Sequence, residues 1–449
     1  MPTDAPFDTG LTSPVSAGRD QAVSDGALLA ALVDAEVALT RALVERGIAP
    51  ATADPSALRE VEIDPAALAR DAVAGGNPVI PLVKALRAGA PESLRDWIHT
   101  GATSQDILDT ALMVVARDAG YAVLKDLVRV NEALAAFAAA HRGTVAAART
   151  LTQHAVPTTI GLRAANWRRG LARAIDRLDD ALAQLPAQLG GAAGTMAALA
   201  ERVRARGSTD DSAERRQETA DGADSDGLSR ERPDAPVLVQ EVRRAYAAAI
   251  GLQHTDTPWH TQRWPITELG DALTQAIDAL GKIATDVATA SRTEIGELSE
   301  PTGGGSSAMP QKQNPTRSVM VRSAALRAPQ LNATLHLASA LAADERPDGA
   351  WHAEWPTLRE LLRLALGSAS HAADLTEGLR VDRDAVDRTL AATGGLIVSE
   401  RLAVALGRER AAEVVARVAD GVPIADLVAP ELLDPEDYIG LSGPFTDPE

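Results

Sequence analysis

The sequence contains no cysteine, and aromatic residues make up only 3% of its 449 residues. Without thiols, the chain has no disulfides, no thiolate metal sites and no cysteine nucleophile. Hydrophobic residues still account for 45% of the chain, with alanine and leucine the most frequent, so we expect a core of aliphatic side chains carried on helices. The length suffices for two or three domains.

Long apolar runs are also missing from the sequence. No early stretch resembles a signal peptide or a membrane span. We therefore expect a cytoplasmic protein that has no membrane partner.

Lysine is scarce as well: four lysines accompany 40 arginines, and the net charge is −18. A charge of this size and sign argues against nucleic acid as the main partner. Two explanations of the composition stay open. One is an acidic surface adapted to a salty cytoplasm, and the other is a GC-rich genome that favours arginine and alanine codons.

Apolar residues recur at steps of three, four or seven positions in three long stretches, and each pattern is typical of one buried face of a long helix. Because long helices on a soluble chain pack against one another, the patterns predict an all-α protein with a central bundle. The three stripes are Leu124, Leu127, Leu134 and Phe137; Trp167, Leu171, Ile175, Leu178, Leu182 and Leu185; and Ile266, Leu269, Leu273, Ile277, Leu280 and Ile283.

Residues 207–234 differ from the rest of the chain in composition. They include many charges but no aromatic and no β-branched aliphatic residue. Because such a segment cannot bury enough apolar surface to become ordered, we predict an exposed, disordered insertion. A partner-binding arm is the alternative.

Four polar clusters interrupt the helical patterns, and the first is HTGATSQDILDTA at residues 99–111. Thr103 and Ser104 precede a helical pattern that starts near Ile107, with Asp106 placed to cap it. One interpretation is an ordinary helix N-cap. The other is a carboxylate site made of hydroxyls and backbone N–H groups at the helix start.

The second and third clusters each offer a side chain suited to an anionic substrate. RTLTQHAVPTT at 149–159 joins two helical segments and contains Gln153 and His154; the histidine is either structural or a proton carrier. PWHTQR at 258–263 ends in Arg263, which could pair with a substrate carboxylate or form an exposed structural salt bridge.

The fourth cluster, GGGSSAMPQKQNP at 303–315, is too polar and too rich in glycine for a core element. Its glycines favour a mobile lid that carries Ser306 and Ser307, and Lys312 and Asn314 follow near the next helix. A phosphate-binding loop is not indicated, because glutamine rather than serine or threonine follows the lysine.

Two further kinds of site are not indicated either. The GGAAGT stretch at 190–195 follows no predicted strand and is therefore no dinucleotide fingerprint. The eight histidines show no paired spacing of the kind that binds zinc, so we expect no metal.

The string GSSAMPQKQNP resembles GSSxMPxKxNP, a highly specific signature of the fumarase/aspartase superfamily. TSQD and the RT–Q stretch resemble the other two signature regions of that superfamily, in the same order. Within the superfamily the chain is most similar to the 3-carboxy-cis,cis-muconate cycloisomerases, over most of its length outside 207–234. The similar blocks are residues 76–87, 99–112, 149–159, 189–195, 258–263, 349–355 and 433–440.

Departures from the superfamily pattern distinguish a cycloisomerase from the typical lyases of the superfamily. Typical lyases have a histidine where this chain has Leu151, and often a supporting glutamate where it has Val319. The cycloisomerases also lack this pair and have a histidine one residue after the glutamine, as His154 is here. Adenylosuccinate lyase shares the H-x-G-x-T-S portion and is the disfavoured alternative. Gln313 and Trp264 in turn depart from the cycloisomerase pattern, which has an arginine and an acidic residue there.

The resemblance implies catalysis through an aci-carboxylate, the dianion left when a proton α to a carboxylate is removed. It implies that Ser306 is the base and that Lys312 and Asn314 stabilise the enolate-like oxygens. His154 carries a proton or binds the substrate, and these alternatives stay open. The expected carboxylate clamp is His99, Thr103, Ser104, Gln153 and Arg263, with Ser307 beside the base.

The implied reaction turns 3-carboxy-cis,cis-muconate, a small tricarboxylate, into a lactone without a metal or organic cofactor. The implied fold has three helical domains, expected at 1–109, 110–350 and 351–449, and assembles as a homotetramer in which the signature regions meet from different subunits. The alternatives are another lyase of the superfamily and a non-catalytic helical protein. Intact Ser306, Lys312 and Asn314 count against the latter.

Overall fold

The computed structural model describes residues 9–206, 234–305 and 307–447. Helices dominate these ranges, which confirms the predicted all-α class. Of the segment 207–234, predicted to be a disordered insertion, all but Asp234 lies outside the described residues, and so does Ser306. No single helix in the described ranges is long and apolar enough to cross a membrane, although one bent pair, Arg383–Ala391 with Leu396–Leu406, passes by length and composition.

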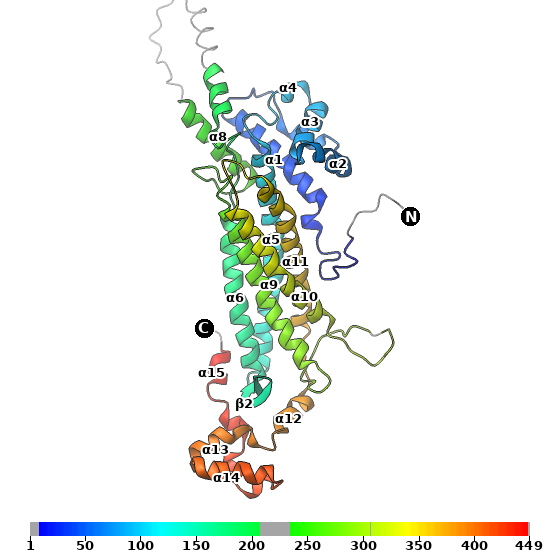
Figure 1. Cartoon of the computed structure of the whole chain (residues 1–449), viewed down its shortest axis with the longest axis vertical. Helices are drawn as coiled ribbons and strands as arrows, with labels where there is room; N and C mark the ends of the chain where they lie inside the picture. The colour runs from blue at the N-terminus through cyan, green and yellow to red at the C-terminus, as the bar shows by residue number, and fades with distance from the viewer. Residues whose placement is uncertain (1–8, 207–233, 306, 448–449) are drawn as a thin grey trace, which may run out of the picture.

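Long helices form an elongated central bundle (Figure 1). α5 packs against α6 and α11, and α9 packs against α6, α10 and α11. The predicted apolar stripes lie almost entirely inside this bundle, so local periodicity identified the faces that pack. The bundle helices are α5 (Ser104–Ala140), α6 (Ile160–Ala183), α9 (Trp264–Ala290), α10 (Thr316–Ala340) and α11 (Gly349–Glu377).

One end of the bundle, the upper end in Figure 1, carries the amino-terminal helices and α8. α1 packs against both α5 and α8 there. A further helix starts at 197 and reaches 206, where the described range ends. The elements of this end are α1 (Asp25–Glu45), α2 (Pro65–Gly75), α3 (Val79–Gly89), α4 (Glu92–Arg95) and α8 (Ala235–Ile250).

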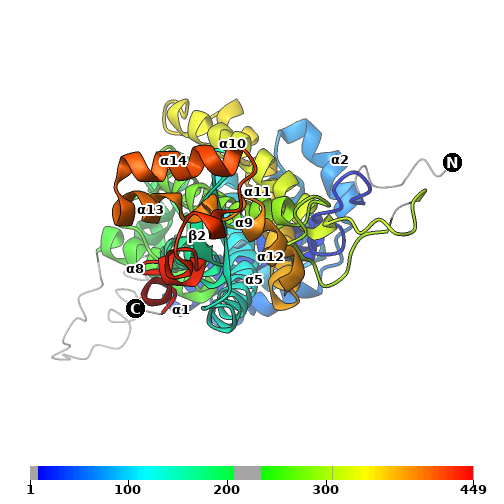
Figure 2. The same cartoon turned by 90° about the horizontal axis from the view of Figure 1, so that it is seen from below.

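The opposite, lower end carries two short strand pairs and the carboxy-terminal helices, which Figure 2 shows in front of the bundle. β1 and β2 form an antiparallel hairpin, and β3 pairs with β4. The elements are β1 (Val145–Thr150), β2 (Gln153–Thr159), β3 (Leu298–Ser299), β4 (Arg380–Val381), α12 (Arg383–Ala391), α13 (Ser399–Leu406), α14 (Arg408–Ala419) and α15 (Ser442–Thr446).

The expected domain limits at 109/110 and 350/351 fall inside continuous helices. α5 already begins at Ser104, directly after the residue that caps it, and α11 continues to Glu377. Both helices pack against other bundle helices. The central bundle therefore extends beyond the predicted limits in both directions.

A buried ion-pair cluster joins three bundle helices at the upper end. The Arg263 guanidinium, just before α9, lies 2.7 Å from an Asp109 oxygen on α5 and 2.6 Å from a Glu354 oxygen on α11. All three side chains are at most 1% exposed. Trp351 donates its indole N–H to Asp109 over 2.8 Å. The cluster fixes where the three helices meet.

Replacing Arg263 with methionine should destabilise the protein strongly, because two buried carboxylates would lose the cation that compensates them. We expect the free energy of unfolding to fall by about 3–5 kcal/mol, measured by denaturant unfolding. Arg410→Met is the matched control, since it breaks an exposed pair with Glu413 and should cost less than about 1 kcal/mol. Equal losses in the two variants would contradict the assigned role.

Candidate active site

The first turn of α5 is held in place by a single aspartate. The backbone N–H of Thr103 donates to Asp106 over 2.9 Å, which confirms the predicted cap. The Asp106 carboxylate also accepts from the backbone N–H groups of Gly190 and Gly191, at 2.8 and 2.9 Å, and pairs with His260 Nε2 at 2.8 Å. The N-cap and the carboxylate-site interpretations are compatible here, because the cap fixes the helix start that would face an anion.

His99 is oriented by a buried glutamate of α1. Its backbone N–H donates to Glu36 Oε2 over 2.9 Å, and its ring Nδ1 lies 2.7 Å from Glu36 Oε1. The histidine has a positive φ of 62°, a conformation that non-glycine residues adopt rarely. Burial lowers the pKa of His99, but the hydrogen bond and the negative charge of Glu36 outweigh burial and raise the pKa overall. With Nδ1 committed to Glu36, Nε2 is the nitrogen left to face a ligand.

His99 and Ser104 line the same cavity of about 390 Å³, together with residues of α3. The α3 residues include two cations, Lys84 and Arg87, that the sequence did not single out as site residues. The block GNPVIPLVKALR, which carries part of the resemblance, was the signal that could have indicated them.

A third cation that the sequence analysis did not single out lies next to Thr103. Arg346, in the loop between α10 and α11, donates to Thr103 Oγ1 and to the Ala192 carbonyl, the latter over 3.3 Å. Sequence spacing gives no signal for this contact, because 243 positions separate Arg346 from Thr103. The upper end thus brings His99, Thr103 and Ser104 together and places three cations close to them.

The predicted residues Gln153 and His154 lie in the lower hairpin. They begin β2, opposite Thr150 and Arg149 of β1. The two turn residues, Leu151 and Thr152, both have positive φ, at 47° and 71°, as the type I′ turns that form two-residue hairpin loops require. Leu151, at the position where typical lyases have their histidine, is 96% exposed at the hairpin tip.

A buried carboxylate anchors this hairpin to its surroundings. Glu297 accepts two hydrogen bonds from Arg149, at 2.7 and 2.9 Å, and one from Thr389 of α12, at 2.5 Å. Burial raises the pKa of Glu297, but these bonds and the arginine charge lower it overall. The charged form therefore holds β1 against the segment that precedes β3.

The loop before α10 projects from the bundle (Figure 1). Its neck is closed by two backbone hydrogen bonds between Gly304 and Asn314, at 2.8 and 3.1 Å. A Cβ on Gly304 would come within 2.0 Å of the short Thr316 side chain, which favours glycine there, whereas a Cβ on Gly303 would meet the movable end of the Gln313 side chain.

The loop presents its predicted site residues to solvent. Lys312 and Ser307 are exposed, and Asn314 is half-buried, with its amide donating to Gly305 over 3.3 Å. Ser306, the predicted base, lies outside the described residues.

The upper and lower groups lie at opposite ends of α5. This helix has 37 residues and is therefore about 55 Å long. His99, Thr103 and Ser104 stand at its amino-terminal end, and the hairpin with Gln153 and His154 follows its carboxy-terminal end. One copy of the chain does not bring the two groups into one site.

Arg263 is the predicted substrate contact that the structure corrects. Its guanidinium donates to Asp109 and Glu354 and is 1% exposed. Because association with other chains can only bury it further, it does not reach a substrate. The structural salt bridge, the alternative interpretation of PWHTQR, is therefore the correct one, although it is buried.

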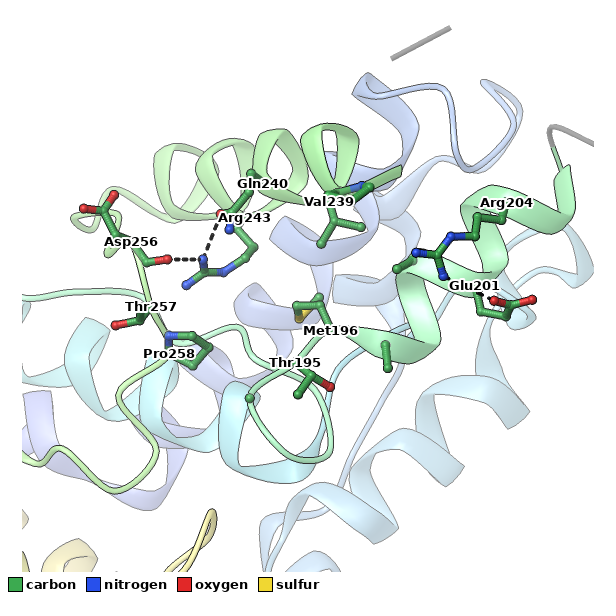
Figure 3. A pocket seen from close by; sticks show the side chains of 14 residues that line it. Thr195, Met196, Glu201, Arg204, Val239, Gln240, Arg243, Asp256, Thr257 and Pro258 are labelled. Atoms are coloured by element: carbon green, nitrogen blue, oxygen red, sulfur yellow. Dashed lines mark hydrogen bonds and ion pairs between the residues drawn. The ribbon is translucent and has the colours of Figure 1, made fainter. Parts of the chain in front are cut away.

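A larger cavity, of about 670 Å³, lies beside α8 and contains none of the predicted site residues (Figure 3). Arg243 points toward Gln240 and Asp256 on one side, and Arg204 pairs with Glu201 on the other. Arg243 also donates to the Leu189 and Thr255 carbonyls, so its guanidinium is fully engaged by the protein. Size alone therefore does not make this cavity the candidate site.

A metal centre is not indicated by the side chains that the structure describes. In residues 9–206, 234–305 and 307–447, no group of three or more histidine, aspartate or glutamate side chains is arranged to hold a metal ion.

Taken together, the chain is a long-helix bundle that carries hydroxyls, histidines and cations on the loops at its ends. Comparison with known proteins then identifies the family. A family model described as lyase matches residues 29–206 and 232–329. The chain belongs to this lyase family, within the fumarase/aspartase superfamily.

Relatives with high identity to the chain include proteins with two different activities. The chain is 43% identical to a nitrosuccinate lyase of Streptomyces davaonensis, over 99% of this chain and 94% of the relative. It is 39% identical to a 3-carboxy-cis,cis-muconate cycloisomerase of Pseudomonas aeruginosa, over 86% and 78%. Among solved structures, the 3-carboxy-cis,cis-muconate lactonizing enzyme from Pseudomonas putida matches with a TM-score of 0.82 and 30% identity, over 97% of both chains.

The pKa of His99, which is paired with Glu36, should be shifted in the opposite direction from the pKa of His371, which has no hydrogen bond to a carboxylate. We expect His99 to titrate above its ordinary pKa of 6.5 and His371, whose pKa burial lowers, to titrate below it. Nuclear magnetic resonance of histidine-labelled protein measures both, with His99→Gln and His371→Gln assigning the signals.

The raised pKa of His99 also determines whether its contribution to the free energy of unfolding rises or falls with pH. Because the folded pKa exceeds the unfolded one, the contribution of His99 is complete below about pH 6.5. It is lost as the pH rises through the folded pKa. The difference in unfolding free energy between wild type and His99→Gln should therefore shrink from pH 6 to pH 9, and a difference that grows with pH would contradict the pairing.

Proposed function

We propose that this chain is a cytoplasmic, cofactor-free lyase that removes a proton α to a carboxylate of a small polycarboxylate. The observation that supports this most directly is where the signature regions lie. The first occupies the capped start of α5, the second the lower hairpin, and the third the projecting loop with Lys312 and Asn314. All three are end loops on a rigid bundle, the usual place for reacting groups.

Each group has a role that its chemistry suits. The aci-carboxylate gains a second negative charge, so Lys312 and Asn314 would supply a cation and an amide donor where that charge develops. Ser306 would accept the proton, helped by the nearby lysine once the loop has closed over the substrate. The hydroxyls of Thr103 and Ser104 would hold a second carboxylate at the start of α5. Gln153 and His154 would approach from another copy.

Elimination of nitrous acid from nitrosuccinate is the first candidate reaction. The 43% identity to a nitrosuccinate lyase over 99% of this chain favours it, and so do the departures Gln313 and Trp264 from the cycloisomerase pattern. In this reaction the base takes a proton from the carbon α to one carboxylate. The electron pair forms the double bond, nitrite leaves the adjacent carbon, and fumarate results.

Cyclisation of 3-carboxy-cis,cis-muconate is the second candidate, favoured by the sequence blocks and by the 39% identity to a cycloisomerase. Here one carboxylate oxygen adds to a double-bond carbon, and the adjacent carbon receives a proton. Nothing leaves, and the product is a carboxymuconolactone. Both candidates require the same stabilisation of an aci-carboxylate.

Two assays on the purified full chain separate the candidates. Nitrosuccinate is assayed for released nitrite, and 3-carboxy-cis,cis-muconate for loss of its diene absorbance, each in low and high salt. Nitrite at an enzymatic rate supports the first candidate, and diene loss with a lactone product supports the second. Activity in neither assay would contradict both, and adenylosuccinate would be tested next.

Lys312 should be essential for turnover and dispensable for folding, because it is exposed on the loop. We expect Lys312→Met to lower kcat by at least about a hundredfold on whichever substrate reacts, with an unchanged melting temperature. Lys282→Met, which breaks an exposed pair with Asp286 on α9, is the control and should keep full activity. Turnover of Lys312→Met near that of the control would overturn the mechanism.

We further propose that the chain assembles as a homotetramer and that its active site is shared between copies. The separation of the upper and lower groups by the length of α5 requires sharing if both belong to one site. α10 supplies an interface, since one face carries Val319, Leu326, Leu337 and Leu341, all at least 54% exposed. Their spacing of 7, 11 and 4 residues places them on one side of the helix.

A shared site predicts that two inactive variants restore each other. His99→Gln alters the upper end and Lys312→Met the lower end. When both are unfolded together and refolded as mixed oligomers, activity should return to about a quarter of the wild-type value, because half of the copies keep each end intact. Light scattering would confirm the tetramer, and a mixture as inactive as its components would contradict the sharing of a site.

A further inference from the structure

The face of α3 that lines the cavity beside His99 has no role in the mechanism above. Lys84 and Arg87 are one turn apart on this helix and both line that cavity with His99 and Ser104. No carboxylate is among the residues that line it. In the described part of the chain, neither Lys84 nor Arg87 makes an ion pair with a carboxylate. Uncompensated cations on a cavity wall attract an anion.

Arg87 is fixed at the cavity by the backbone that precedes His99. Its Nη2 donates to the Ile98 carbonyl over 2.9 Å. Its positive charge reaches His99, because it acts to lower the pKa of that histidine, against the larger effect of Glu36. Arg87 is therefore held close to the ring that we expect to contact the substrate.

The remaining wall of the cavity is apolar. Val79 and Val83 are buried, whereas Ile80 is 53% exposed on the same helix. Lys84 and Arg87 are themselves exposed, so the wall combines two charged groups with an apolar surface. A ligand with a short hydrocarbon skeleton and several negative groups matches both parts of this wall.

We propose that Lys84 and Arg87 bind a third anionic group of the substrate, the group that a simple dicarboxylate lacks. This inference rests on the proposed function for the identity of the other two groups. In 3-carboxy-cis,cis-muconate the third group is a carboxylate. In nitrosuccinate it is the nitro group, which gains negative charge as nitrite leaves. The α3 face thus selects trianionic substrates and their nitro analogues over plain dicarboxylates.

The test measures binding of unreactive probes to the full chain by calorimetry at low salt. Tricarballylate carries three carboxylates, and succinate carries two on a similar skeleton. Wild type should bind tricarballylate about tenfold more tightly than succinate, and Lys84→Met should lose that preference while binding succinate within about twofold of wild type. Lys84→Arg, which keeps the charge, should retain most of the preference.

Lys125→Met is the matched control, because Lys125 is an exposed lysine on α5 that does not line the cavity. It should bind both probes as wild type does. Circular dichroism and melting temperature establish that each variant is folded, and Arg87→Met provides a second, independent test with the same expected loss.

The outcomes separate this inference from the proposed function. A preference that depends on Lys84 supports the inference even if neither substrate reacts, in which case the proposed reaction alone is wrong. Equal binding of the two probes by wild type, or a preference that survives in both Lys84→Met and Arg87→Met, overturns the inference even if one substrate reacts.

Discussion

The arrangement of the upper end depends on one buried cation between two buried carboxylates. Arg263 satisfies Asp109 and Glu354 at once, and so fixes α9 against α5 and α11. Burial raises the pKa of Glu354 although Arg263 opposes this, because a buried site disfavours the charged carboxylate. The start of α5 at Ser104, five positions before Asp109, is positioned by this cluster. The loops that carry His99 and Thr103 are therefore held in place by an interaction in the core of the bundle.

A second constraint is the length of the bundle helices. A rigid helix of 37 residues keeps its two ends about 55 Å apart, so no movement of the end loops can join the upper and lower groups within one copy. Under the proposed function, catalysis by these groups together requires an assembly of several copies. The exposed apolar face of α10 fits this requirement, since a helix that is apolar on two sides needs partners on both.

Charge is distributed unevenly in this acidic protein. The net charge is −18, yet Lys84, Arg87 and Arg346 gather around His99, Thr103 and Ser104 at the upper end. An acidic surface repels anions in general, whereas a local cluster of cations attracts those that fit. The chain has only four lysines, and two of them, Lys84 on a cavity wall and Lys312 on the projecting loop, stand where the proposed function needs a cation.

The sequence by itself determined the features that depend on neighbours a few positions away. The apolar stripes predicted the buried faces of α6 and α9, Asp106 was recognised as the cap of α5, and the glycines before Lys312 indicated a loop rather than a core element. Only the tertiary structure decided the features that depend on distant partners. Arg263 pairs with residues 154 and 91 positions away, and Arg346 meets Thr103 across 243. Periodicity indicates which face of a helix is buried, but it does not indicate which charged side chain of a neighbouring helix that face will contact.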